Sequence, residues 1–147
     1  MKKVVQSGVK LDRSLIHLLH RASQTADETF AALAEEMDIT PRQFVVLSAI
    51  ASNPSSSQTA IVETTGIDRS TLAEMVRRLE GRGLLRRKRS KLDARAYVVD
   101  LTSKGRNMVK RVEPVIAEAD KALLGTLGRK RGAELVKLLD VVIEGAA

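Results

Sequence analysis

The architecture of this chain follows from residues 57–101, SQTAIVETTGIDRSTLAEMVRRLEGRGLLRRKRSKLDARAYVVDL. Two short helix-forming runs lie on either side of Gly66, which can adopt the left-handed conformation of a tight turn. Asp68 is a suitable N-cap for the second helix, and Gly83 stops it. The sequence therefore predicts a helix, a tight turn and a second helix over residues 69–82.

The helix predicted over residues 69–82 is amphipathic. Leu72, Met75, Val76 and Leu79 recur at steps of three and four and form its inward face. The opposite face combines guanidinium groups and hydroxyls, which suits the major groove of duplex DNA. The candidate DNA-binding residues of this helix are Arg69, Ser70, Thr71, Glu74, Arg77 and Arg78.

These side chains differ in what they can recognise. Arg77 can pair bidentately with guanine, and a Glu74 carboxylate can accept from cytosine N4, so we place base reading on Arg77, Ser70, Thr71 and, as one of two options, Glu74. The other option for Glu74, which we favour, is a helix salt bridge with an arginine at i+3 or i+4. Arg69 and Arg78 are better suited to phosphate.

A two-stranded ribbon is predicted after this helix. Residues 84–89 and 95–101 have strand-forming composition and flank the polar connection 90–94. The tip of such a ribbon is a wing that can lie on DNA beside the helix. The candidate wing residues are Arg86, Arg87, Lys88, Arg89, Lys91, Asp93 and Arg95.

The positive charge is concentrated in the same part of the sequence. Residues 68–106 hold twelve Lys and Arg against five Asp and Glu, which accounts for the whole net charge of +7, since the rest balances at thirteen against thirteen. A contiguous positive segment is typical of a polyanion-binding surface. With Tyr97, Phe30 and Phe44 as the three aromatic residues, stacking on single strands is disfavoured, so double-stranded DNA is the expected partner.

Long amphipathic helices are predicted on both sides of this module. Apolar residues recur at helical spacing over 11–37, from about 103 to 124, and over 129–144, and the last of these is more apolar than a helix facing water should be. These helices could cover a monomeric core, but we favour a two-fold dimer interface, which would match a pseudo-palindromic operator. We therefore divide the chain into a flexible arm (1–10), a helical dimerisation region (11–37 and 103–147) and a DNA-binding region (38–102), intertwined as one domain.

Composition excludes several other classes of protein. The sequence has no cysteine, which removes disulfides, thiolate metal sites and thiol redox switching. No apolar run is long enough to span a membrane, and the first eight residues are basic without the apolar stretch of a secretory signal, so we expect a cytoplasmic protein. No motif supports catalysis or a cofactor, so we expect no enzyme.

Four stretches together resemble the MarR (multiple antibiotic resistance regulator) family, over almost the full length from Leu11 to Ile143. They are residues 40–47 (TPRQFVVL), 66–72 (GIDRSTL), 79–87 (LEGRGLLRR), and 93–96 (DARA) followed by 101–106 (LTSKGR). The resemblance implies a mainly α fold with a small β-ribbon (α+β), a winged helix-turn-helix with N- and C-terminal dimerisation helices. It also implies a dimeric DNA-binding regulator of transcription, more commonly a repressor.

The resemblance further assigns a role to the wing. An Asp-x-Arg pattern, here Asp93 and Arg95, implies that Asp93 orients Arg95 and that Arg95 enters the minor groove, where the negative potential attracts a guanidinium. Many members of the family carry a further Arg between these positions. This sequence has Ala94 instead, so one wing contact to the DNA backbone is in doubt.

A small-molecule effector is also implied by the resemblance. In this family an anionic or aromatic molecule enters a cleft between the dimerisation helices and the DNA-binding lobe, and it releases the DNA. His17, His20, Arg21 and Arg42 are candidate cleft residues because they can pair with a carboxylate. The alternatives are a ligand-independent architectural DNA-binding protein and a metal-responsive regulator, although no metal-ligand pattern is present in the sequence.

Overall fold

The structure is a computed structural model that describes Gly8 and residues 10–145. The predicted arm, residues 1–10, lies almost entirely outside the described residues. After a 3-10 turn at Leu11–Arg13, the elements are α1 (Leu15–Leu33), α2 (Pro41–Ser52), β1 (Ser56–Ser57), α3 (Gln58–Thr65), α4 (Arg69–Gly81), β2 (Leu85–Arg89), β3 (Tyr97–Leu101), α5 (Ser103–Gly125) and α6 (Gly128–Gly145).

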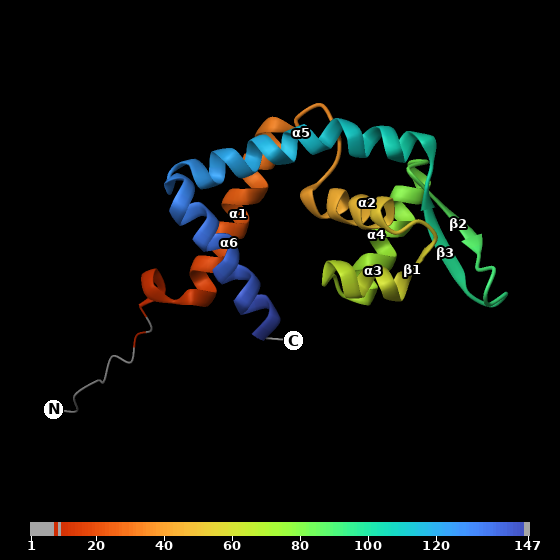
Figure 1. Cartoon of the computed structure of the whole chain (residues 1–147), viewed down its shortest axis with the longest axis horizontal. Helices are drawn as coiled ribbons and strands as arrows, with labels where there is room; N and C mark the ends of the chain where they lie inside the picture. The colour runs from red at the N-terminus through yellow and green to blue at the C-terminus, as the bar shows by residue number, and fades with distance from the viewer. Residues whose placement is uncertain (1–7, 9, 146–147) are drawn as a thin grey trace.

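Two lobes are joined by the long helix α5 (Figure 1). One lobe holds α2, α3, α4 and the small sheet, which lie under one end of α5. The other lobe holds α1 and α6, which pack against α5 toward its opposite end. In the described part of the chain, no helix combines the length and apolar character that crossing a bilayer requires.

The hydrophobic core lies in the lobe that contains the helix-turn-helix. Leu47, Ile50, Leu72, Leu79 and Leu84 are almost completely buried there. Burial of such side chains stabilises a fold by about 1.5–3 kcal/mol each. This lobe therefore has the packing needed to hold α4 rigidly.

The helices of the other lobe leave much apolar surface uncovered. Ile16 of α1 is 73% exposed, and Ile143 of α6 is 68% exposed. Leu15, Leu138 and Val141 are also exposed. So many large apolar side chains exposed on two helices of one lobe indicate an interaction site.

Side-chain caps begin helices α2 and α3. Thr40 forms a capping box with Gln43 and precedes Pro41 at the first helical position of α2. Ser57 caps α3 through the backbone N–H of Ala60. Such caps supply acceptors for N–H groups that a helix start leaves without a partner.

The first helix is shorter than predicted. A single helix over 11–37 is wrong, because Ser14 caps α1 and the helix ends at Leu33, with Ala34 as its C-cap. The chain then turns, and Asp38 takes a positive φ of 46° before α2 begins. The apolar pattern continued to residue 37 because Ala34 lies in the core and Met37 packs against it.

The sheet has one strand more than predicted. The predicted ribbon is present as β2 and β3, which pair antiparallel, and the added strand β1 pairs antiparallel with β3 and gives the order β1-β3-β2. The two-residue strand β1 follows Ser55, which has a positive φ of 59°. So short a strand has no alternation to detect, and its sequence is typical of a turn. Strand β3 also starts at Tyr97, two residues later than predicted.

Candidate nucleic-acid interface

Helix α4 is held at its start by Asp68. The Asp68 carboxylate accepts from the backbone N–H of Thr71 (2.9 Å) and from the hydroxyl of Ser70 (2.7 Å). These hydrogen bonds, with those from Thr71 the largest cause, hold the pKa of Asp68 well below its ordinary value. The Ser70 hydroxyl, predicted to read a base, therefore donates to the cap and keeps its acceptor lone pairs available.

The inward face of α4 is buried as predicted, with Leu72, Val76 and Leu79 in the core and Met75 packed against it. The opposite face is exposed at Arg69, Arg77 and Arg78. Arg69 donates to the hydroxyl of Thr59 on α3 (3.3 Å), so it links the two helices of the motif.

Glu74 lies between two arginines on this outward face. Its carboxylate accepts from Nε and Nη2 of Arg77 (2.9 and 2.8 Å) and from Nε of Arg78 (2.7 Å). Hydrogen bonding by Arg77 first and Arg78 second lowers the pKa of Glu74 to about 2, and the same contact raises the pKa of Arg77. The helix salt bridge that we favoured for Glu74 is present.

The wing is a short, well-connected loop between β2 and β3. The Ser90 hydroxyl accepts from the backbone N–H groups of Leu92 (3.1 Å) and Asp93 (3.3 Å). At the base of the loop, the Arg89 guanidinium lies 5.6 Å from the centre of the Tyr97 ring and donates to the carbonyl of Ala94 (2.7 Å). Arg89 thus stabilises the loop and is only partly available to DNA.

Asp93 orients Arg95 through the backbone. Its carboxylate accepts from the backbone N–H of Arg95 at 2.8 Å. Within residues 10–145, no ion pair joins Asp93 to the guanidinium of Arg95. The carboxylate therefore shapes the turn from which Arg95 projects and leaves its guanidinium to solvent.

Two of the predicted wing cations have partners inside the protein. Arg87 pairs with Glu80 of α4 (3.1 Å), and Lys88 pairs with the buried carboxylate of Asp100 (2.5 Å). Among the described residues, Arg86, Lys91 and the Arg95 guanidinium have no such partner. These last three are the wing cations most available to phosphate.

Asp100 was not recognised from the sequence as a structural residue. Its carboxylate accepts from Lys88 and also from the backbone N–H (2.6 Å) and hydroxyl of Ser55, so it ties both long strands to β1. Hydrogen bonding by Lys88 first, then by Ser55, lowers its pKa. A signal was present, because Asp100 interrupts the apolar strand Tyr97–Leu101.

We expect Asp100→Asn to destabilise the fold by about 2 kcal/mol at pH 7, because the amide loses the charge that pairs with Lys88 in a buried position. The folded-state pKa is lowered, so the contribution of Asp100 is fully present above its ordinary pKa near 4 and is lost as the pH falls below that. Urea unfolding measures the free energy of unfolding of wild type and variant, and the difference between the two should be smaller at pH 3 than at pH 7. An equal difference at both pH values would contradict this.

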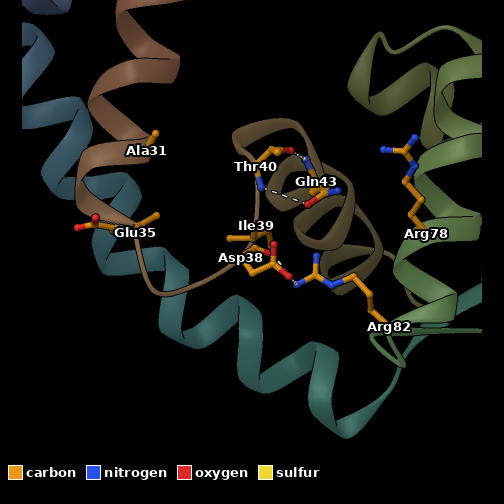
Figure 2. Close-up of a pocket in the computed structure, with 9 residues that line it drawn as sticks. Ala31, Glu35, Asp38, Ile39, Thr40, Gln43, Arg78 and Arg82 are labelled. Carbon is orange, nitrogen blue, oxygen red and sulfur yellow. Dashed lines mark hydrogen bonds and ion pairs between the residues drawn. The ribbon is translucent and has the colours of Figure 1, made fainter.

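A hollow separates the end of α1 from α2 and α4 (Figure 2). It has a volume of about 520 Å³ and is bordered by Glu35, Thr40, Gln43 and Arg78. Arg82, at the end of α4, donates to the backbone carbonyl of Asp38 and pairs with its carboxylate (3.2 Å). This contact joins the end of α4 to the connection between the two lobes.

The predicted effector residues are not gathered in one place within the protomer. Arg42 borders a neighbouring hollow of about 390 Å³ together with Phe30 and Pro41. His17, His20 and Arg21 are exposed on α1, the helix that also exposes Leu15 and Ile16. In the part of the chain that the structure describes, no three His, Asp or Glu side chains are placed to hold a metal ion.

Sequence comparison agrees with this geometry. Residues 37–96 match the profile of the MarR family. The transcriptional regulator HosA of Escherichia coli O157:H7 is 33% identical over 121 residues, which are 82% of this chain and 90% of HosA. The chain belongs to the MarR family. This MarR protein is a DNA-binding regulator of transcription, and the family predicted from the four sequence stretches is confirmed.

Solved structures of MarR proteins share the fold. Bordetella bronchiseptica BpsR, whose DNA binding is regulated by 6-hydroxynicotinic acid, has a TM-score of 0.86 at 29% identity, covering 92% of this chain and 96% of BpsR. The repressor CouR, bound to a 23-mer DNA duplex, has a TM-score of 0.83 at 35% identity, covering 93% and 99%. The predicted winged helix-turn-helix of the MarR type is confirmed.

Proposed function

We propose that this MarR protein is a sequence-specific repressor that binds double-stranded operator DNA as a homodimer in the cytoplasm. The observation that carries the proposal is the placement of cations: Arg77 and Arg78 lie on the outward face of a rigidly packed α4, and Lys91 and Arg95 lie on the adjoining wing. The similarity to CouR, which was solved on duplex DNA, supports the same surface.

In this proposal the dimer forms through residues 11–37 and 103–147. The exposed apolar side chains of α1 and α6 support that assignment, because a second copy would bury them and would place two copies of α4 about a two-fold axis. Residues 38–102 then form the DNA-binding region, and half-sites one helical turn apart would match the two-fold axis.

Fluorescence anisotropy with duplexes enriched from a random library, measured against a scrambled duplex over a salt series, tests this function. We expect a specificity ratio of about 10³ or more. Equal binding to both duplexes would indicate an architectural protein that binds by charge. No binding to either duplex would reject the function altogether.

We also propose that an anionic aromatic molecule releases the DNA by binding between the lobes. The regulation of BpsR by 6-hydroxynicotinic acid supports this chemical class, and Arg42 at the edge of a hollow offers a partner for a carboxylate. Once the dimer forms, His17, His20 and Arg21 could face the same cleft. A ligand acts only through its different affinities for the free and bound shapes of the protein.

Benzoate, salicylate and 6-hydroxynicotinic acid should therefore bind in a reciprocal manner with DNA. For the acid that binds most tightly, we expect saturating operator DNA to weaken binding about tenfold, and saturating acid to weaken operator binding by the same factor. Calorimetric titration of the acid with and without DNA measures the first effect, and titration of the DNA with and without the acid measures the second. If none of the three acids changes operator affinity, the proposed ligand class is wrong.

A further inference from the structure

The Glu74 carboxylate and the two guanidinium groups of Arg77 and Arg78 form an exposed cluster on the DNA-facing side of α4, which we call the Glu74 cluster. The three hydrogen bonds within it are 2.7–2.9 Å long. The side chains of Arg77 and Arg78 are 67% and 64% exposed, and that of Glu74 is 43% exposed. The cluster therefore lies where DNA would meet the helix.

The fold has little need of this cluster. Ion pairs that lie in water contribute little to stability. Helix α4 is already fixed by its Asp68 cap and by the buried side chains of Leu72, Val76 and Leu79. The main effect of the Glu74 carboxylate is thus on what the two arginines can bind.

A carboxylate is similar to a phosphate as a partner for arginine, since both accept from the planar guanidinium at two oxygens. Glu74 occupies Nε and Nη2 on one edge of Arg77, and it occupies Nε of Arg78. The carboxylate also fixes the direction in which each guanidinium points, so an arginine that turns from that direction toward a backbone phosphate must leave Glu74. Exchanging one anion for another yields little free energy, so phosphate contact is weakened on DNA of any sequence.

Base reading by Arg77 does not need this exchange. The Nη1 side of its guanidinium is not engaged by Glu74, and a guanidinium held on one edge can still present the other edge to the O6 and N7 acceptors of guanine. A fixed orientation also reduces the entropy lost when that pair forms. The operator complex can therefore keep the cluster, whereas a complex with random DNA breaks it when the arginines turn toward phosphates.

We propose that Glu74 determines specificity by restraining Arg77 and Arg78 from backbone phosphates, so that binding to non-operator DNA is weakened more than binding to the operator. This inference rests on the proposed function, because it concerns the same DNA-binding surface. It assigns to Glu74 a positioning role and not a direct contact with a base.

The test compares wild type with Glu74→Gln, on a duplex that wild type enriches from a random library and on a scrambled duplex of the same composition. We expect the variant to bind the scrambled duplex about tenfold more tightly and the enriched duplex within about threefold of wild type, so that the specificity ratio falls. The slope of log affinity against log salt on the scrambled duplex should steepen by about one. Thermal unfolding should be unchanged.

Glu63→Gln is the matched control. Glu63 is exposed on α3 of the same motif and is paired with no arginine among the described residues. Its replacement by glutamine removes the same negative charge as Glu74→Gln. We expect it to change binding to either duplex by less than about threefold. If both variants gain the same affinity for the scrambled duplex, the effect comes from net charge, and the inference is overturned.

Two other outcomes would also overturn it. A loss of about tenfold on the enriched duplex alone would show that Glu74 reads a base, as a carboxylate can at cytosine N4. No change on the scrambled duplex would show that the cluster does not restrain the arginines. If wild type enriches no sequence, the proposed function fails, while the scrambled duplex still tests the restraint by Glu74.

Discussion

Replacing Gly105 by alanine is expected to destabilise the protein by about 3 kcal/mol. Gly105 is buried in the first turn of α5, and a Cβ at this position would lie 2.1 Å from the backbone carbonyl oxygen of Leu84 and 3.3 Å from Cδ2 of Leu101. An added methyl group can be accommodated only if the chain moves.

The backbone at Leu84 has little freedom to move. Its carbonyl accepts from the backbone N–H of Thr102 (3.1 Å) and from the Thr102 hydroxyl (3.2 Å), and that hydroxyl also donates to the carbonyl of Gly83 (2.6 Å). These contacts join the segment that follows α4 to the start of α5. A shift of Leu84 would break them and would disturb a side chain that is fully buried.

Urea unfolding of the wild type and the variant measures this effect, and Gly81→Ala is the control. Gly81 is the last residue of α4, where an added Cβ would meet nothing within 4 Å. Alanine there should be neutral or should stabilise the helix by up to about 1 kcal/mol. If the free energy of unfolding of Gly105→Ala is within about 0.5 kcal/mol of the wild-type value, the backbone at Leu84 can move to accommodate the methyl group.

Sequence reasoning succeeded where the interaction is local. Asp68 caps α4 through the backbone N–H of Thr71, three residues away, as predicted. Gly66 takes the left-handed conformation at the end of α3. In each case a few neighbouring residues determine the backbone geometry, so the pattern alone is sufficient.

Contacts between distant parts of the chain could not be predicted in this way. Ser55 and Asp100 are separated by 45 residues, and Asp38 and Arg82 by 44. Both Ser55 and Asp38 have a positive φ, which is uncommon outside glycine and carried no sequence signal here. The charge count located the excess of cations in residues 68–106, but it could not show which of these cations have partners inside the protein.

The candidate site was predicted unevenly for the same reason. The outward face of α4 follows from helical periodicity, and the structure places Arg77 and Arg78 there. The positions of the candidate effector residues depend on how α1 meets other helices, which in the proposed dimer include helices of the second copy. His17 and Arg42 therefore remain predictions that rest on the family resemblance.

Arg95→Ala is expected to weaken operator binding by about 100-fold, the largest effect we predict for a single contact. The loop that carries Arg95 is held by Ser90 and by the Asp93 carboxylate, which accepts from the backbone N–H of Arg95, so the side chain is presented at low entropic cost. Its guanidinium is exposed and can enter a narrow minor groove, where the negative potential is strongest.

Lys91→Ala, on the same loop, separates groove insertion from general attraction. Lys91 is exposed and bears one charge, so its loss should weaken binding to operator and scrambled duplexes alike and reduce the salt slope by about one. Arg95→Ala should instead act mainly on the operator, because only there is the wing held in register over the groove. If Arg95→Ala binds the operator within threefold of wild type, the wing contributes charge alone. Sequence specificity would then come from α4.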